Sequence, residues 1–170
     1  KAAAGAQIRI IGDYDIDGVN ATYILLEGLE SLGANVDSDI PHRVEDGYGL
    51  NIDLIERASR DGIDTIVTCD NGIAAYDAIS YGKELGMTII VTDHHEPLEV
   101  LPEAVAVIDC KRKDNNYPFN SFAGVGVAFK LIQALGIELK LEEKEYLKFL
   151  DIVCIGTISD IVPLVDENRV

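Results

Sequence analysis

Short apolar runs alternate with segments of helical periodicity over the first two thirds of the chain. Ile8–Gly12 is typical of a buried strand, and the apolar positions of Val19–Leu32 recur at helical spacing until Gly33, a common helix stop. The same alternation predicts strands at Asn35–Ile40, Ile63–Thr68, Met87–Thr92 and Ala104–Ile108, and helices at about Asn51–Arg60 and from Asn71-Gly72 to about Leu85. This order favours an open, mainly parallel five-stranded α/β sheet with helices on both faces.

The last third of the chain changes to a helical pattern. Helices are expected at Val125–Leu135, Glu142–Phe149 and Asp151–Ile161. We therefore expect a trimmed or disordered tail at residues 1–7, a parallel α/β core at 8–110, and a loop and helical continuation of the same domain at 111–170.

The composition is strongly acidic. The 170 residues contain 14 Lys and Arg against 30 Asp and Glu, a formal net charge of −16, with 48% hydrophobic residues. Such a surface repels nucleic acid and anionic membranes in general. An anionic substrate must therefore be held locally, by metal ions or by a focused basic patch.

Three widely spaced cysteines without a CxxC motif indicate reduced thiols and a cytoplasmic protein. Cys69 and Cys154 lie in apolar runs, where we expect them to be buried. No apolar run approaches the ~20 residues of a membrane span. No signal peptide is visible, so no membrane partner is expected.

Three aspartates at every second position follow the first strand. Side chains two apart on extended backbone point to the same side, roughly 6–7 Å apart, so Asp13, Asp15 and Asp17 repel one another. A bound cation is the usual compensation. The alternative is a solvated acidic turn whose aspartates cap the next helix.

Further candidates follow the third and fourth strands. Asp70 lies before Asn71-Gly72, and the fourth strand runs into Asp93-His94-His95. Ligands gather at the carboxyl ends of parallel strands, although Asp70 could instead be a helix cap and the histidines a surface pair. Adjacent histidines on extended backbone face opposite ways, so we expect one to bind metal, with Asp93 fixing a histidine tautomer.

Asp160 is a lone carboxylate in the apolar helical stretch 154–163. It is either a further ligand or a helix-end residue paired to an arginine. Oxygen-rich ligation with little imidazole suits Mn²⁺ or Mg²⁺. The number of carboxylates indicates two metals, the arrangement that serves phosphoryl displacement.

Four motifs in chain order resemble those of the DHH phosphoesterase superfamily. They are Asp13-Tyr14-Asp15-Ile16-Asp17-Gly18, Asp70 in Thr-Cys-Asp-Asn-Gly, Asp93-His94-His95, and Gly156-Thr157-Ile158-Ser159-Asp160. Residues 43–50, 117–119 and 123–130 are similar to its RecJ-like branch of single-strand-specific 5′→3′ DNA exonucleases.

The resemblance implies two divalent cations, Mn²⁺ or Mg²⁺, and attack by a metal-bound hydroxide that releases mononucleotides during DNA repair and recombination. Asp13 would lie at or beside the metals, and His95 beside them or on the scissile phosphate. The implied metal ligands are Asp15, Asp17, Asp70 as the bridge, His94 and Asp160.

Candidate substrate contacts are Arg43 and Tyr48 in the Gly-Tyr-Gly loop, His95, and more weakly Lys130. Arg43 could instead form a surface ion pair with Glu45 or Asp46. The basic run at 111–113 is interpreted as a solvated loop. The expected partners are single-stranded DNA and a helicase or single-strand-binding protein, with a monomeric chain.

Members of this superfamily carry a DHH-associated C-terminal domain that is expected to be absent from this chain. We therefore expect the N-terminal catalytic domain alone, with metal binding retained. Two alternatives stay open. One is a small-substrate phosphoesterase acting on pyrophosphate, oligoribonucleotides or cyclic dinucleotides, whose first motif tends to start with a histidine where this chain has Arg9 and Ile11. The other is a catalytically inactive scaffold in a replication complex.

Overall fold

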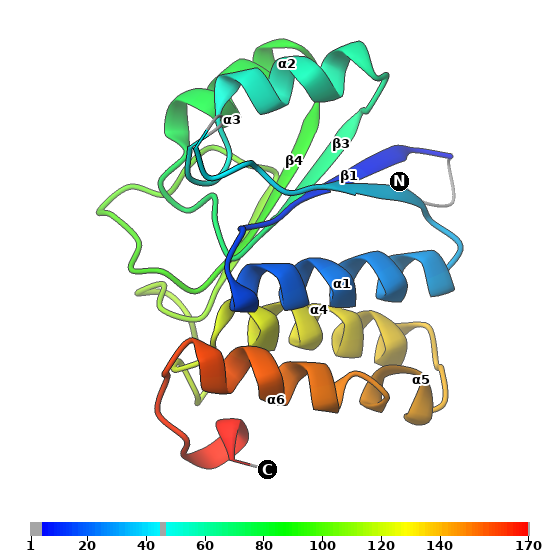
Figure 1. Ribbon diagram of the computed structural model, residues 1–170, viewed down its shortest axis with the longest axis vertical. Helices are drawn as coiled ribbons and strands as arrows, with labels where there is room; N and C mark the ends of the chain where they lie inside the picture. Colours follow the sequence, from blue (N-terminus) through cyan, green and yellow to red (C-terminus); the bar gives the residue numbers. More distant parts are fainter. Residues whose placement is uncertain (1–4, 45–46, 170) are drawn as a thin grey trace.

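The computed structural model describes residues 5–44 and 47–169. Residues 1–4 of the expected tail, and Glu45 and Asp46, lie outside the described residues. A single sheet of parallel strands has the order β2-β1-β3-β4-β5 (Figure 1). Its strands are β1 Gln7–Ile11, β2 Asn35–Asp39, β3 Thr65–Cys69, β4 Thr88–Asp93 and β5 Ala106–Asp109. The predicted α/β class and parallel sheet are confirmed.

Helices cover both faces of the sheet, as the alternating pattern predicts (Figure 1). On one face lie α2 and α3; on the other, α1 and α4 pack on the sheet, and α6 packs against α1 and α4. The helices are α1 Ile16–Ser31, α2 Ile52–Arg60, α3 Tyr76–Glu84, α4 Gly124–Glu138, α5 Lys144–Leu147 and α6 Leu150–Ser159, with a 3-10 turn, η2, at Asp166–Asn168.

The two faces form separate hydrophobic cores because successive strand residues point to opposite sides. Ile10 packs with Leu25 and Phe129 in the core under α1 and α4. Its neighbour Ile11 packs with Leu54 in the core under α2 and α3. Strands buried on both faces are continuously apolar, which is why they could be recognised in the sequence.

The prediction that Asn71-Gly72 opens a helix is wrong. The helix begins only at Tyr76, and residues 70–75 form a loop in which Asp70 and Gly72 adopt positive φ angles of 60° and 107°. The Asn71 amide donates to the backbone oxygens of Ile11 and Cys69 and accepts from Leu50 N–H. Its side chain therefore ties three segments together and is not available to cap a helix.

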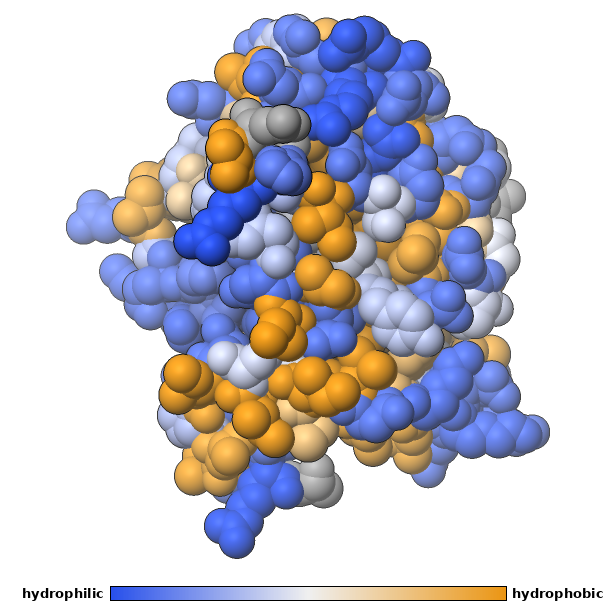
Figure 2. Space-filling model, in the orientation of Figure 1, coloured by the Kyte–Doolittle hydropathy of each residue, from blue (hydrophilic) through white to orange (hydrophobic). Residues whose placement is uncertain are grey.

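The apolar stretch before Asp160 is helical, but Cys154 is exposed rather than buried. The reason is that α6 forms an outer layer in which only Gly156 and Thr157 are fully buried. Figure 2 shows apolar side chains on the surface over α6 and the chain's C-terminal turn, and Ile158 and Ile161 are among the exposed residues. The helix expected over residues 142–149 is only the short α5. Within the described residues, no helix has both the length and the apolar character needed to span a bilayer.

Candidate metal centre

The carboxyl edge of the sheet brings together side chains that are far apart in the sequence. The segment after β1 supplies three aspartates, β3 leads into Asp70, β4 leads into His94, and α6 ends at its C-cap Asp160. Their polar atoms form three overlapping groups, each within 4.8 Å. The groups are Asp13, Asp15 and Asp70; Asp17, His94 and Asp160; and Asp70, His94 and His95.

His94 and Asp70 lie at the middle of this arrangement. His94 Nε2 is 3.0 Å from Asp70 Oδ1 and 3.8 Å from Asp17 Oδ2, while His94 Nδ1 is 3.8 Å from Asp160 Oδ2. The 3.0 Å approach is not aligned as a hydrogen bond, since both atoms are left without a partner. Two ligands at right angles on an ion with bonds of ~2.1 Å lie ~3.0 Å apart. The spacing therefore fits two ligands of one ion.

The hydrogen bonding also fits a cation. Within residues 5–44 and 47–169, the buried side-chain atoms without a hydrogen-bond partner are Asp70 Oδ1, both ring nitrogens of His94, and Asp109 Oδ2. Buried polar atoms are nearly always satisfied in folded proteins. Three of these four atoms belong to residues expected to bind metal. The donor set of carboxylates with one imidazole suits Mn²⁺ or Mg²⁺.

Burial makes the charged carboxylates unfavourable in the absence of a cation. It raises the pKa of Asp70 to about 7, and it also raises the pKa values of Asp13 and Asp17. In the described part of the chain, the ion pairs place only histidine nitrogens opposite Asp17, Asp70 and Asp160. A divalent cation would supply the missing positive charge and favour the ionised form of Asp17 and Asp70.

The three aspartates after β1 have different surroundings. Asp15 is the N-cap of α1 and accepts from Gly18 N–H at 2.9 Å. Asp13 accepts from the N–H of the next residue at 2.8 Å. Asp17 is buried, and its two oxygens accept from two backbone N–H groups at the start of α4. Helix capping, the alternative for this cluster, therefore holds for Asp15 without removing it from the metal-binding group.

The two histidines point to different partners. His94 is buried inside the cluster, whereas His95 is about half exposed and its Nδ1 lies 2.7 Å from Asp93 Oδ1. Asp93 also accepts from the backbone N–H groups of His94, His95 and Ile73. Burial alone would raise the pKa of Asp93, but the hydrogen bonds from His95 and Ile73 outweigh burial and lower that pKa. The bond to Asp93 raises the pKa of His95 to about 9. Asp93 therefore orients His95 rather than His94.

Comparison with known proteins places this geometry in a family. Residues 7–157 match the family described as "DHH family, N-terminal domain". The chain belongs to the DHH family. It is 47% identical over 163 residues to the single-stranded-DNA-specific exonuclease RecJ of Bacillus subtilis, covering 96% of this chain and 20% of that protein. It is 40% identical over 176 residues to RecJ of Escherichia coli, covering 98% of this chain and 30% of that protein.

A solved structure supports the same fold. The crystal structure of an exonuclease RecJ bound to manganese superposes with a TM-score of 0.88 at 37% identity, covering 98% of this chain and 42% of that chain. The DHH chain thus spans between a fifth and a third of the length of these two curated relatives. Activity, substrate and partners of the longer proteins are therefore taken up as proposals.

Two expected substrate contacts lie beside the cluster that the three metal groups form. Tyr48 Oη is 3.4 Å from the backbone oxygen of Asp70 and 3.5 Å from His95 Nε2. The Arg43 guanidinium lies over the ring of Tyr14, 5.4 Å from its centroid, and Tyr14 meets Tyr48 edge-on. Tyr14 therefore links Arg43 to the cluster. The alternative ion-pair partners of Arg43 at residues 45 and 46 lie outside the described residues.

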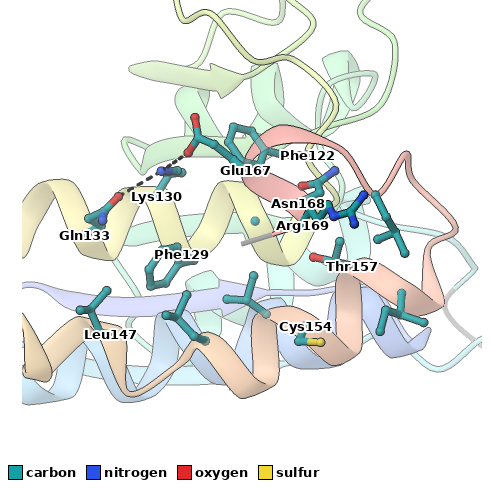
Figure 3. Close-up of a pocket in the computed structure, with 15 residues that line it drawn as sticks. Phe122, Phe129, Lys130, Gln133, Leu147, Cys154, Thr157, Glu167, Asn168 and Arg169 are labelled. Atoms are coloured by element: carbon teal, nitrogen blue, oxygen red, sulfur yellow. Dashed lines mark hydrogen bonds and ion pairs between the residues drawn. The ribbon is translucent and has the colours of Figure 1, made fainter.

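Lys130 is not brought to the cluster. Its ammonium lies 2.5 Å from Glu167 Oε2 and donates to Gln133 (Figure 3). Tyr117 also donates to Glu167, at 2.8 Å. Lys130, Gln133 and Glu167 line a cavity of about 480 Å³ between α4, α6 and the C-terminal turn, and no residue of the metal groups lines it. Glu167 neutralises Lys130, so the structure does not support a phosphate contact there. In the 111–113 run, Arg112 pairs with Asp114.

The sequence reasoning missed Asp109 as a member of this edge. It ends β5, in register with Asp93, and it is buried. Its Oδ1 accepts from Lys111 N–H, its Oδ2 has no partner, and burial raises its pKa to about 6. The rule that ligands gather at strand ends, applied to the fifth strand, would have found it.

Proposed function

We propose that this DHH chain is the catalytic domain of a two-metal phosphodiesterase, of the RecJ type that degrades single-stranded DNA from the 5′ end. The supporting observation is the group of carboxylates around His94, in which Asp70 Oδ1 and both ring nitrogens of His94 are buried without a hydrogen-bond partner and would be satisfied by divalent cations. The named relatives support the choice of substrate. The proposal includes a single-strand-exposing partner such as a helicase, a monomeric chain and a cytoplasmic location.

The overlapping groups support a division of the ligands between two ions. Asp15, with Asp13 beside it, would hold one ion, while Asp17, His94 and Asp160 would hold the other. Asp70 would bridge them, since it belongs to one group with Asp13 and Asp15 and to another with His94. Bound cations in such a pair supply a nucleophile at neutral pH and stabilise charge on the attacking and leaving oxygens.

Side chains around the cluster would hold the DNA. His95 is kept cationic by Asp93, and its Nε2 faces Tyr48, so it can donate a hydrogen bond to a phosphate oxygen. Arg43 lies on the same side through Tyr14 and can bind a phosphate with its planar fork. Against a net charge of −16, these two cations provide the local attraction that an anionic strand requires.

Turnover on matched substrates tests the proposal. The natural polypeptide that contains this sequence is incubated with Mn²⁺ and offered single-stranded DNA labelled at the 5′ or the 3′ end, duplex DNA, a dinucleotide and pyrophosphate. We expect mononucleotide release from single strands only, with the 5′ label released first. Asp70→Asn should abolish that release.

Other outcomes would select an alternative. Hydrolysis of pyrophosphate or dinucleotide without attack on the single strand would replace the exonuclease with a small-substrate phosphoesterase. Mn²⁺ binding without hydrolysis of any substrate would favour the inactive scaffold. Release of the 3′ label first would contradict the polarity.

A further inference from the structure

The first residue of α4 lies directly against the proposed bridging carboxylate. A Cβ atom built on Gly124 would lie 2.6 Å from Asp70 Oδ1, 2.7 Å from Asp70 Cβ and 2.8 Å from Asp70 Cγ. Carbon atoms attract best at roughly 3.5–4.0 Å, so these distances are strongly repulsive. Residue 124 can occupy this position only because it has no side chain.

The same helix end binds a second carboxylate of the cluster. Gly124 N–H donates to Asp17 Oδ2 at 2.6 Å, and Val125 N–H donates to Asp17 Oδ1 at 2.9 Å. The first N–H groups of a helix have no partner within the helix and carry partial positive charge. They therefore stabilise the buried Asp17 carboxylate and fix the direction of both its oxygens.

A side chain at residue 124 could not be accommodated by a local change in Asp70. Rotation about χ1 moves Oδ1 and Cγ but leaves Cβ in place, and Cβ alone would be 2.7 Å away. The Asp70 backbone is held at a positive φ of 60°, and the side chain of the neighbouring Asn71 is hydrogen-bonded to the backbone of Ile11, Leu50 and Cys69. The start of α4 would have to move away from Asp70, which would carry its N–H groups off Asp17.

We infer that Gly124 is a positioning residue of the metal centre: its lack of a side chain lets one helix end orient Asp17 while touching Asp70. The inference rests on the proposed function. It adds α4, which supplies none of the metal-binding side chains, to the elements that set the geometry of both ions.

Gly124→Ala and Gly126→Ala form a matched pair for the test. Both add a methyl group and improve helix propensity in the first turn of α4. At residue 126 the nearest atom to an added Cβ is Phe122 Cδ1 at 3.0 Å, in an aromatic side chain outside the cluster. Mn²⁺ binding is measured by calorimetry on the 170-residue chain, together with thermal unfolding of each metal-free variant.

Gly124→Ala should weaken Mn²⁺ binding by about 10–100-fold, as for other groups that orient metal ligands, while Gly126→Ala keeps the original affinity. Equal affinity in Gly124→Ala and the unchanged chain would overturn the inference and leave the proposed function standing. Equal losses in both variants would also overturn it, because they would reflect the packing of α4 in general. Absence of Mn²⁺ binding by the unchanged chain would overturn the proposed function itself.

A second variant covers the case in which Gly124→Ala does not fold. A Cβ on Gly156 of α6 would lie 2.6 Å from Val125 Cγ1 and 2.9 Å from Asp17 Oδ1. The added methyl group of Gly156→Ala would therefore clash with the start of α4 and with Asp17. Val125 Cγ1 can rotate away, but Val125 Cβ, at 2.9 Å from the added atom, can yield only if the start of α4 moves, so a loss of Mn²⁺ affinity is expected here too. Unchanged affinity in a folded Gly156→Ala chain would contradict the inference.

Discussion

The acidic side chains around Arg9 and those at the carboxyl edge of the sheet have opposite surroundings. In the middle of β1, Arg9 forms two hydrogen bonds with Asp37 of β2, at 2.8 and 2.7 Å, and a third with Asp61, at 2.7 Å. At the carboxyl edge, and counting only the residues that the structure describes, Asp17, Asp70 and Asp160 have ion-pair distances to His94 alone. Arg9 thus neutralises Asp37 and Asp61, whereas among the described residues no lysine or arginine pairs with Asp17, Asp70 or Asp160.

The contrast separates stabilising charges from binding charges. Partially exposed ion pairs such as that of Arg9 contribute modestly to folding, and the hydrogen bond to Asp37 raises the pKa of Arg9 still further. The carboxyl edge instead buries Asp70 and Asp109, each with one oxygen that has no hydrogen-bond partner, which is unfavourable for the metal-free fold. Proteins retain such groups where a ligand compensates them.

Replacing the bridging acid should give the largest effect. Asp70→Asn removes one negative charge and one anionic oxygen that two metal groups share, so Mn²⁺ affinity should fall by more than the roughly 10–100-fold seen when a supporting group is lost. The metal-free chain should be as stable as before or more stable, because a desolvated charge disappears. Calorimetry and urea unfolding in chelator measure the two effects. Retained affinity would remove Asp70 from the ligand set.

The pH dependence of stability should be large in the absence of metal. Asp70 has a pKa of about 7 in the fold against roughly 3.9 in an unfolded chain. Between these values the folded state holds a proton that the unfolded state has released, so the free energy of unfolding falls as pH rises from about 4 to about 7. Unfolding in chelator across this range measures the loss.

Mn²⁺ should reverse that trend, because ligands must be deprotonated to bind and affinity therefore rises with pH. The Asp70→Asn chain should lose the part of the pH dependence that Asp70 causes. A metal-free stability that increases over the same range would show that the carboxyl edge is already compensated.

Asp93 provides a contrast within the carboxyl edge. It accepts from His95 Nδ1 and from three backbone N–H groups, whereas Asp70 Oδ1 has no partner. Asp93→Asn should destabilise the metal-free chain by about 3 kcal/mol, the scale of losing hydrogen bonds to a buried charge. Thermal unfolding measures this loss. A change as small as that of Asp70→Asn would mean that these bonds contribute little.

The smallest effect is expected at the ion pairs of Arg9. Asp37→Asn should lower the free energy of unfolding by about 1 kcal/mol, since Asp37 is half exposed and such pairs are screened by solvent. Mn²⁺ affinity should not change, because Asp37 belongs to none of the metal groups. If Mn²⁺ affinity fell with Asp37→Asn, the Arg9 ion pairs and the carboxyl edge would be coupled, and the division of roles between them would be wrong.

Much of the fold and of the cluster was accessible from the sequence because the signals are local. Continuous apolar runs marked strands buried on both faces, and the aspartates and histidines follow those runs directly. Errors occurred where tertiary contacts override a local pattern. Asn71-Gly72 has the composition of a helix start, but its amide bonds to Ile11 and Leu50 and keeps a loop open. Cys154 lies in an apolar run, yet α6 is only partly covered.

The sequence by itself determined the order of strands and helices and the residues that reach the carboxyl edge, because strand periodicity and strand ends are encoded by neighbouring residues. The tertiary structure decided how those residues are used. It joined Asp17 to an N–H group 107 positions away and paired Lys130 with Glu167. Such choices depend on which distant segments pack together, and no local pattern records the geometry of that packing.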